Sequence, residues 1–423
     1  MNINVTFEEW INNRNLPYWG TNFGTEAIAF QRWRHFKEAY APEIVKRAIL
    51  ESEIPVKNCL DPFGGSGTTA LACQFLGVAP TTIEVNPYLS DLIQAKLERY
   101  DFSTLSNDLG AVVKRSYSIS INIDSIRESL PPTFIEPGVK GRWIFDAECA
   151  IRIFKILAAI DELHNVKNKK LFKILLGGIL IDISNVKVNG KGRRYKKNWV
   201  NNRVMPEKVD KIFQLSVTNA ISDITLYQQR KSLEYNLLTG DSRQLINKVS
   251  EIDLCIFSPP YPNSFDYTDV YNVELWVLGY LKNAFDNNKL RKNTLSSHVQ
   301  TKRVYSLPPK SSKSLDSTMK GLENVKSDLW NKDIPSMVGA YFYELMNMIE
   351  TIKSKMSPNS KLWMIVGDSK YQGIYIPVAT ILVELATSLG FTVDTIEAFR
   401  SMRSSAQQGG RKDLKETLVV LKN

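Results

Sequence analysis

Cysteine and histidine are scarce in this chain of 423 residues, which contains four cysteines and three histidines. No two cysteines form a Cys-x-x-Cys pair, and no histidine lies at metal-ligand spacing from a cysteine. A disulfide framework and a zinc site are therefore not expected, and we predict no metal. The cysteines lie mostly in apolar segments, which is typical of reduced, buried thiols in a cytosolic protein.

Long apolar runs are also missing. The most apolar stretch, LFKILLGGILIDI at residues 171–183, is too short to span a bilayer and predicts a core helix. The N-terminus, MNINVTFEEWINNRN, has no cationic start followed by an apolar run, so no signal peptide is expected. These patterns predict a cytoplasmic protein without a membrane partner.

Acidic residues are fewer than basic ones, 44 against 54, which gives a net charge of +10. A basic excess favours an acidic partner such as nucleic acid, but many basic proteins bind no polyanion, so composition leaves this open. The hydrophobic content of 43% is typical of a folded, soluble protein and excludes a disordered chain.

Alternating strand and helix signals predict an α/β fold. Residues 57–100 give strand, Gly-rich turn, helix, strand and helix, and the alternation resumes from about residue 233 to the C-terminus. This order implies a mainly parallel sheet covered on both faces, with ligands beyond the carboxyl ends of the strands. Residues 102–230 interrupt it with a mostly helical pattern that predicts an inserted subdomain. Residues 282–335, rich in Ser, Lys, Asn and Pro, predict a long, mobile surface loop.

A turn of small residues follows the first strand of this pattern. In LDPFGGSGTTA, residues 60–70, an acid and a proline precede Gly64-Gly65-Ser66-Gly67, and a helix follows. Glycines let a ligand approach the backbone, and the start of the helix offers free N–H groups. A phosphate-binding P-loop is excluded because Gly-Lys-Ser/Thr is missing, and Asp61 would repel the pyrophosphate of a dinucleotide. The acid favours a cationic ligand.

A rigid polar corner ends a second buried strand, in CIFSPPYPNSFDY at residues 255–267. Its residues Ser258-Pro259-Pro260-Tyr261 can continue neither a strand nor a helix. Alone, this tetrapeptide would be read as a proline-terminated strand with a packing tyrosine. Its occurrence together with the Gly-rich turn favours a functional site over a purely structural role.

Together the two segments resemble the amino-methylating DNA methyltransferases, which transfer a methyl group from S-adenosylmethionine (AdoMet) to an exocyclic amine of a base. Asp61 to Thr69 resembles the AdoMet motif of that family, and Ser258 to Tyr261 resembles its catalytic motif. The resemblance covers residues 30–100 and 233–280 well, and residues 340–423 by strand order. It implies a Rossmann-like, mainly parallel seven-stranded methyltransferase sheet with a largely helical insert.

The resemblance also implies a cofactor site. In that family the Gly-rich turn cradles the methionine moiety, Glu84 matches the acid that holds the ribose hydroxyls, and Asp241 matches the polar residue beside the adenine. Residues 32–49 resemble the helix-entry motif that completes the pocket. The implied AdoMet-binding residues are Phe36, Pro42, Asp61, Pro62, Phe63, Gly64, Gly65, Ser66, Gly67, Thr68, Thr69, Glu84, Asn86, Asp241 and Ser242.

The catalytic motif suits chemistry at an amino group, whose lone pair is delocalised into the base ring. The Ser258 hydroxyl and the Pro259 carbonyl are suited to accept hydrogen bonds from the NH2 group, so that its nitrogen becomes tetrahedral. Pro259 and Pro260 fix the direction of that carbonyl, and Tyr261 offers a face on which a flipped-out base stacks. Asp266 and Tyr267 are expected either to contact this base or to cap a helix.

Serine before Pro-Pro-Tyr leans towards the N4 amine of cytosine in this family, whereas Asp or Asn more often accompanies N6 of adenine. The resemblance therefore implies a site-specific DNA methyltransferase that forms N4-methylcytosine, with double-stranded DNA as partner and a cognate restriction endonuclease as an optional second partner. Three alternatives stay open: an N6-adenine DNA methyltransferase, an RNA guanine-N2 or adenine-N6 methyltransferase, and an inactive subunit that only binds nucleic acid.

Basic clusters outside the two motifs are candidates for DNA contacts. Residues 187–203, KVNGKGRRYKKNWVNNR, hold seven basic residues and no acidic one, which suits phosphate binding or merely a solvated loop. The loop expected over 282–335 and the cluster at 399–412 are further candidates, the former for base edges. The candidate DNA-binding residues are Lys191, Arg193, Arg194, Lys196, Lys197, Trp199, Lys302 and Arg303.

The expected organisation has five segments. Residues 1–101 carry the helix-entry motif and the AdoMet-binding half, 102–230 the helical insert and candidate target-recognition region, 231–281 the catalytic half, 282–335 the basic polar loop, and 336–423 the C-terminal strands and helices.

Overall fold

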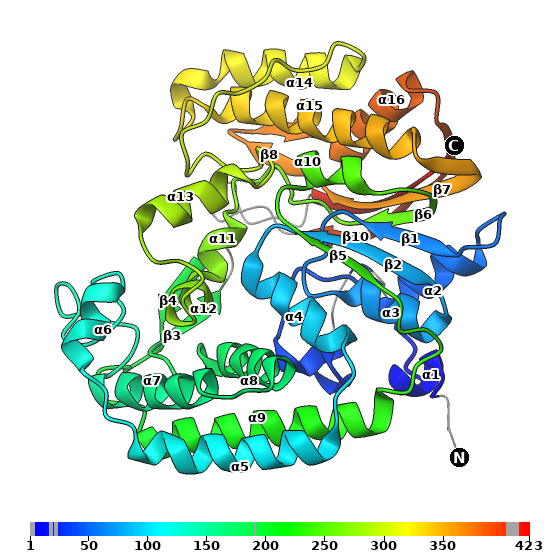
Figure 1. The fold of residues 1–423 in the computed structure, drawn as a ribbon. Coiled ribbons are helices and arrows are strands. Elements are labelled where there is room, and N and C mark those ends of the chain that lie inside the picture. The colour runs from blue at the N-terminus through cyan, green and yellow to red at the C-terminus, as the bar shows by residue number, and fades with distance from the viewer. Residues whose placement is uncertain (1–4, 17–19, 21–23, 190–191, 403–413) are drawn as a thin grey trace.

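The computed structural model describes residues 5–16, 20, 24–189, 192–402 and 414–423. A seven-stranded sheet crosses the middle of the molecule in the order β10-β11-β7-β6-β1-β2-β5 (Figure 1). Neighbours from β7 to β5 pair in parallel, whereas β11 is antiparallel to both β7 and β10. The mainly parallel seven-stranded sheet is thus confirmed. Its strands are β1 (Asn58–Asp61), β2 (Ala79–Glu84), β5 (Asn236–Thr239), β6 (Ile252–Phe257), β7 (Met356–Gly367), β10 (Thr392–Met402) and β11 (Leu414–Lys422).

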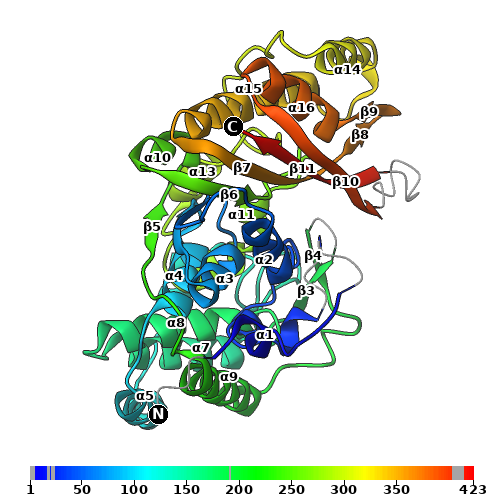
Figure 2. The same cartoon turned by 90° about the vertical axis from the view of Figure 1, so that its right-hand side faces the viewer.

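Helices cover both faces of this sheet (Figures 1 and 2). One face carries α14 (Lys313–Asn324), α15 (Ile334–Lys353) and α16 (Val378–Ser388), and the other carries α2 (Pro42–Leu50), α3 (Thr68–Leu76) and α4 (Pro87–Leu97). Successive strand residues point to opposite faces: Cys59 and Leu254 join the core under α2 to α4, whereas Leu60 and Cys255 join the core under α15 and α16. Because both faces are covered here, the central strand β6 is buried at almost every position.

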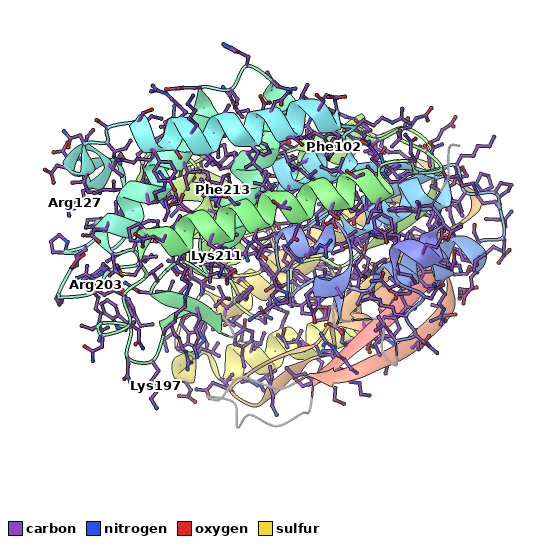
Figure 3. All side chains as sticks on the ribbon, turned by 90° about the horizontal axis from the view of Figure 1, so that it is seen from below. Phe102, Arg127, Lys197, Arg203, Lys211 and Phe213 are labelled. Carbon is purple, nitrogen blue, oxygen red and sulfur yellow. The ribbon has the colours of Figure 1, made fainter. Side chains whose placement is uncertain are left out.

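Residues 102–230 form a further helical layer beneath α4. It consists of α5 (Phe102–Ser118), α6 (Ile123–Ser129), α7 (Ala147–Asp161), α8 (Val166–Ile179), the hairpin β3 (Val186–Asn189) and β4 (Gly192–Tyr195), and α9 (Pro206–Tyr227). The long helices α5 and α9 lie side by side on the outer surface, where Phe102 and Lys211 mark them (Figure 3). Buried residues of α7, α8 and α9 belong to the same hydrophobic core as those of α2 to α4. The insert therefore shares its core with the sheet.

A buried carboxylate anchors the helix-entry segment to this insert. Asp223 of α9 accepts hydrogen bonds from the backbone N–H of Phe30 (2.8 Å) and from Trp33 Nε1 (2.9 Å), and it pairs with Arg32. Its side chain is fully buried. The position of residues 30–33 beside the sheet thus depends on a residue almost two hundred positions later in the chain.

The prediction of a surface loop over residues 282–335 is wrong. This segment contains α13 (Ala284–Lys292) and α14, whose N-terminus is capped by Ser312. Leu315 and Leu322 are fully buried on one side of α14, Leu290 of α13 is buried in the other core, and Leu295 is buried with the α14 leucines. A few apolar residues at helical spacing suffice to dock these helices, and the polar residues between them hide the pattern.

Short elements complete the chain: α1 (Phe7–Trp10), α10 (Ser242–Leu245), α11 (Tyr267–Val270), α12 (Asn272–Val277), β8 (Ser369–Tyr371) and β9 (Ile374–Ile376). The four cysteines are buried and free. Within the described residues, no helix combines the length and apolarity needed to cross a membrane.

Candidate active site

The carboxyl ends of β1, β2, β5 and β6 meet at one edge of the sheet, because these strands are parallel. A cavity of about 360 Å³ opens there. It is bounded by the turn after β1, the end of β2, the turn after β5 and the corner after β6. The Gly-rich turn and the Ser258–Tyr261 corner, which the sequence analysis identified, therefore line the same cavity.

The Gly-rich turn is folded tightly against β2. The N–H of Gly64 donates to the carbonyl of Ile83 (2.9 Å), and a Cβ at Gly64 would lie 2.3 Å from Thr82. Gly67 caps α3 with φ of 82°, a conformation that side chains disfavour. From behind, the buried Lys96 donates to the carbonyl of Ser66 (2.7 Å), and burial lowers the pKa of Lys96 to about 7.

Asp61, at the end of β1, is a buried carboxylate at the floor of the cavity. It accepts hydrogen bonds from Thr69 Oγ1 (2.7 Å), from the backbone N–H of Phe63 (3.0 Å) and from the hydroxyl of Tyr40 (3.3 Å). Burial raises the pKa of Asp61 to about 6, against the opposing effect of these hydrogen bonds. Tyr40 lies within the helix-entry motif of residues 32–49, but it was not among the cofactor-binding residues expected from the sequence.

Glu84, at the end of β2, is the second buried acid. Its Oε2 accepts from the N–H of Gly65 (2.7 Å) and its Oε1 from the N–H of Asn86 (2.8 Å). Burial raises the pKa of Glu84 to about 7. Asn86 in turn caps α4 by accepting from the N–H of Tyr88 (3.0 Å). A desolvated acid at a cavity wall is strongly stabilised by any ligand that brings donors or positive charge.

Asp241 and Ser242 close the far end of the cavity, after β5. The Asp241 carboxylate accepts from the N–H of Arg243 (3.0 Å) and pairs with the Arg243 guanidinium (2.7 Å), which also binds Glu344 (2.8 Å). The Ser242 hydroxyl donates to the carbonyl of Pro62. These contacts join the β5 turn to the Gly-rich turn.

Most of the sequence-predicted cofactor residues line this cavity, but Pro42 and Gly67 do not. The placement of Pro42 in the pocket wall is wrong: it is buried as the first residue of α2, a position that suits its fixed φ. Residues 36–40 form that wall instead. The predicted residues that do line the cavity are Phe36, Asp61, Pro62, Phe63, Gly64, Gly65, Ser66, Thr68, Thr69, Glu84, Asn86, Asp241 and Ser242.

All four residues from Ser258 to Tyr261 line the same cavity. Ser258 Oγ lies 3.4 Å from the hydroxyl of Tyr261, which donates to Glu416 Oε1 of β11 (2.9 Å). Burial, reinforced by Glu416, raises the pKa of Tyr261 well above its usual value, so this phenol keeps its proton. Sequence reasoning missed Glu416, because nothing near it in the chain resembles a motif.

Asp266 and Tyr267, which were expected either to contact the base or to cap a helix, have different surroundings in the structure. Asp266 caps α11 by accepting from the N–H of Thr268 (3.0 Å), and it pairs with Arg291 (2.6 Å). Tyr267 lines the cavity. Asp266 thus caps a helix, whereas Tyr267 faces the cavity.

The segment after α13 adds a wall that the sequence did not reveal, formed by Asn293, Thr294, Leu295, Ser297 and His298. Burial lowers the pKa of His298 to about 4, so this imidazole is neutral at physiological pH. Arg303 holds the wall together by donating to the carbonyl of Thr294 (2.6 Å). It was predicted to reach base edges, and this is corrected because its guanidinium is engaged within the protein. Lys302 is exposed.

The basic segment around the β3–β4 hairpin lies beside α11, close to the catalytic corner (Figure 1). Arg194 and Lys197 are exposed, and Lys197 lies at the periphery of the helical layer (Figure 3). Arg193 is directed towards Asp269 of α11, at 3.6 Å. Lys196 is corrected as a phosphate contact, because its ammonium donates to backbone carbonyls, including that of Ser184 (2.6 Å).

Trp199 is also engaged inside the protein. It packs edge-on against Trp143 at 4.9 Å and at a tilt against Tyr195 at 4.8 Å between ring centroids. Trp199 therefore does not offer a free ring face on which an unpaired base could stack. Lys191 and most of the basic cluster at 399–412 lie outside the described residues.

The described part of the chain contains no group of three or more His, Cys, Asp or Glu residues that would suit a metal ion. The cavity instead fits AdoMet, whose sulfonium is positive and whose ribose hydroxyls are donors. The two buried acids at its wall suit the positive charge and the donors that such a ligand brings.

Comparisons with known proteins agree with this geometry. The profile of a family described as "DNA methylase" matches residues 10–95, which include the helix-entry segment and the Gly-rich turn. The chain is 28% identical to the Type II methyltransferase M.AvaI of Nostoc sp., over 92% of this chain and 85% of that protein. It is 24% identical to the Type II methyltransferase M.BsoBI of Geobacillus stearothermophilus, over 99% of this chain and 90% of that protein.

The chain thus resembles the amino-DNA methyltransferases of the N4/N6 family, and these matches support that assignment. AdoMet is therefore its methyl donor. A solved rRNA methyltransferase, aviRa of Streptomyces viridochromogenes, aligns over 91% of this chain and 85% of that chain, at 8% identity and a TM-score of 0.28. Those values are too low to bear on fold or function, and the methyltransferase fold rests on the sheet order described above.

Proposed function

We propose that this N4/N6 methyltransferase is a Type II DNA methyltransferase that methylates the N4 amine of cytosine in a flipped-out base, within a restriction-modification system. The observation that carries the proposal is the meeting of Ser258-Pro259-Pro260-Tyr261 with Asp61 and Glu84 in one cavity. The relatives named Type II methyltransferases, aligned over nearly the whole chain, support the DNA substrate and an endonuclease of matching specificity as partner. Serine at position 258 favours cytosine over adenine.

The residues divide the work by chemistry. AdoMet supplies an electrophilic methyl group on a positively charged sulfur. Asp61 and the Gly-rich turn would hold the methionine end, and Glu84 would accept hydrogen bonds from the ribose hydroxyls. Ser258 Oγ and the Pro259 carbonyl accept hydrogen bonds from the base amine, which frees its lone pair for attack.

DNA contacts are proposed for the insert and for the wall after α13. The exposed cations Lys187 and Arg194 lie on the hairpin that packs on α11, and the exposed Lys197 follows it, so phosphates held there would lie near the catalytic corner. The exposed Lys302 extends the basic surface. Base reading is assigned to the segment 282–335, because it forms part of the cavity wall.

The test is methylation of a DNA library with AdoMet, followed by digestion to nucleosides and mass spectrometry. We expect N4-methylcytosine from the unchanged protein and a large loss of product with Ser258→Ala, while calorimetry shows AdoMet binding preserved. Ser264→Ala is the control, since Ser264 lies in the same loop but does not line the cavity. N6-methyladenine as the product would overturn the choice of base. Bound AdoMet without any DNA methylation would overturn the proposed function.

A further inference from the structure

A chain of polar contacts runs from the antiparallel pair β10–β11 into the catalytic corner. Arg400 donates to both oxygens of Glu416, at 2.6 and 3.2 Å. The hydroxyl of Tyr261 donates to Glu416 Oε1 at 2.9 Å, and Ser258 Oγ lies 3.4 Å from the Tyr261 hydroxyl. All four residues line the cavity, and Glu416 itself is only 3% exposed.

The carboxylate fixes the direction of these hydrogen bonds. An ionised carboxylate only accepts, so the Tyr261 hydroxyl must point its proton at Glu416. The oxygen of Tyr261 is then an acceptor, and the Ser258 hydroxyl is the donor next to it. With its proton turned towards Tyr261, Ser258 has its lone pairs left for other groups in the cavity.

This direction matters because a serine, unlike a carboxylate, carries a proton of its own. A serine hydroxyl that turns its proton towards an amine nitrogen would engage the lone pair needed for attack. The same hydroxyl with its proton engaged elsewhere accepts from the NH2 group and leaves the nitrogen lone pair free. The 3.4 Å between Ser258 and Tyr261 is longer than usual, and such contacts often tighten only when substrate is bound.

We propose that Glu416 is a positioning residue for methyl transfer: acting through Tyr261, it turns the Ser258 proton away from the base and makes this serine an acceptor. Arg400 holds the carboxylate by both oxygens. The proposal rests on the proposed function, because it assumes that Ser258 meets an amine. It assigns a role to the C-terminal strand β11, which carries no recognisable motif.

Glu416→Gln tests the direction of these hydrogen bonds with almost no change in the shape of the side chain. The shorter contact of Arg400, from its Nε at 2.6 Å, keeps the amide oxygen, so the amide NH2 takes the place of Oε1 and faces Tyr261 at the loss of the longer Arg400 contact of 3.2 Å. That NH2 donates to Tyr261, whose proton then turns to Ser258, and the serine proton is released towards the base. We expect kcat to fall about tenfold, less than the roughly 10²–10³ lost with a direct transition-state contact. KM for DNA and AdoMet affinity should stay the same.

A double-mutant cycle separates this role from a structural one. Tyr261→Phe removes the link, so Glu416→Gln should lower kcat no further in that background. Glu397→Gln is the matched control, because Glu397 of β10 pairs with Arg47 (2.8 Å) and does not line the cavity. Thermal unfolding and AdoMet calorimetry accompany every variant.

Three results would overturn the positioning role: an unchanged kcat in Glu416→Gln, effects of the two substitutions that multiply, or a loss of AdoMet binding that accompanies the loss of kcat. Each of these leaves the proposed function standing, because the unchanged protein still methylates DNA. Failure of the unchanged protein to methylate any DNA sinks the proposed function instead, and the two failures are thus distinguishable.

Discussion

Glu84 is expected to lower the stability of the ligand-free protein at neutral and alkaline pH. Burial raises its pKa to about 7 from an ordinary value of 4.5. Since the folded pKa is the higher one, the folded protein binds more protons than the unfolded chain between these values. The free energy of unfolding therefore falls as pH rises from about 4.5 to about 7, and it is level above that. The difference of 2.5 between the two pKa values corresponds to about 3 kcal/mol.

Glu84→Gln removes this charge and keeps the shape. Its amide oxygen can accept from only one of the two N–H groups, Gly65 or Asn86, that Glu84 binds, and the lost hydrogen bond costs about 1 kcal/mol. The variant should therefore be about 2 kcal/mol more stable than the unchanged protein at pH 8. At pH 5, where Glu84 is already neutral, it should be no more stable. AdoMet affinity should fall by about 1–3 kcal/mol, as expected for a lost charge-assisted contact.

The assay is urea unfolding without AdoMet at pH 5 and pH 8, with calorimetry of AdoMet at pH 8. Glu128→Gln on α6 serves as the control, because Glu128 is exposed and does not line the cavity. Asp61 leaves some pH dependence in every variant, since burial raises its pKa to about 6. The reasoning is refuted if Glu84→Gln loses stability between pH 5 and pH 8 as steeply as the unchanged protein does.

Two further predictions concern the insert. Changing Lys187, Arg194 and Lys197 to Gln should weaken binding to all DNA sequences alike and flatten the slope of log K against log salt by up to about 0.9 per lost contact. Fluorescence anisotropy at several salt concentrations measures this, and a changed set of methylated sites would show instead that the hairpin reads bases. Asp223→Asn should lower the free energy of unfolding by about 2–4 kcal/mol, since it leaves buried donors poorly paired. AdoMet affinity should fall with it, because Phe36 follows the anchored segment; calorimetry that shows full affinity would contradict this coupling.

Sequence patterns were sufficient to predict the parts of this protein that depend on neighbouring residues. The Gly-rich turn and the Ser258–Tyr261 corner are contiguous, and their glycines and prolines impose backbone conformations that few other residues allow. The alternation of strands and helices was enough to predict a mainly parallel sheet, and a parallel sheet brings its carboxyl strand ends together. For that reason the two motifs could be expected, from the order of residues alone, to share one site.

Which polar side chains are free and which are engaged was decided by the tertiary fold. Lys196, Arg303 and Trp199 look in the sequence like surface groups for DNA, but each has partners within the protein. The helices of segment 282–335 were missed because a few leucines dock them against cores formed mostly by other segments of the chain.

The same reason explains why Glu416 was missed beside a catalytic motif that the sequence showed plainly. It meets Tyr261 from 155 positions away in the chain, through the pairing of β11 with β7. A hydrogen bond between distant segments leaves no local pattern, because its energy depends on the burial and geometry that the whole sheet imposes. Local backbone constraints could thus be predicted from the sequence, whereas the long-range polar contacts that orient the catalytic groups are determined only by the tertiary structure.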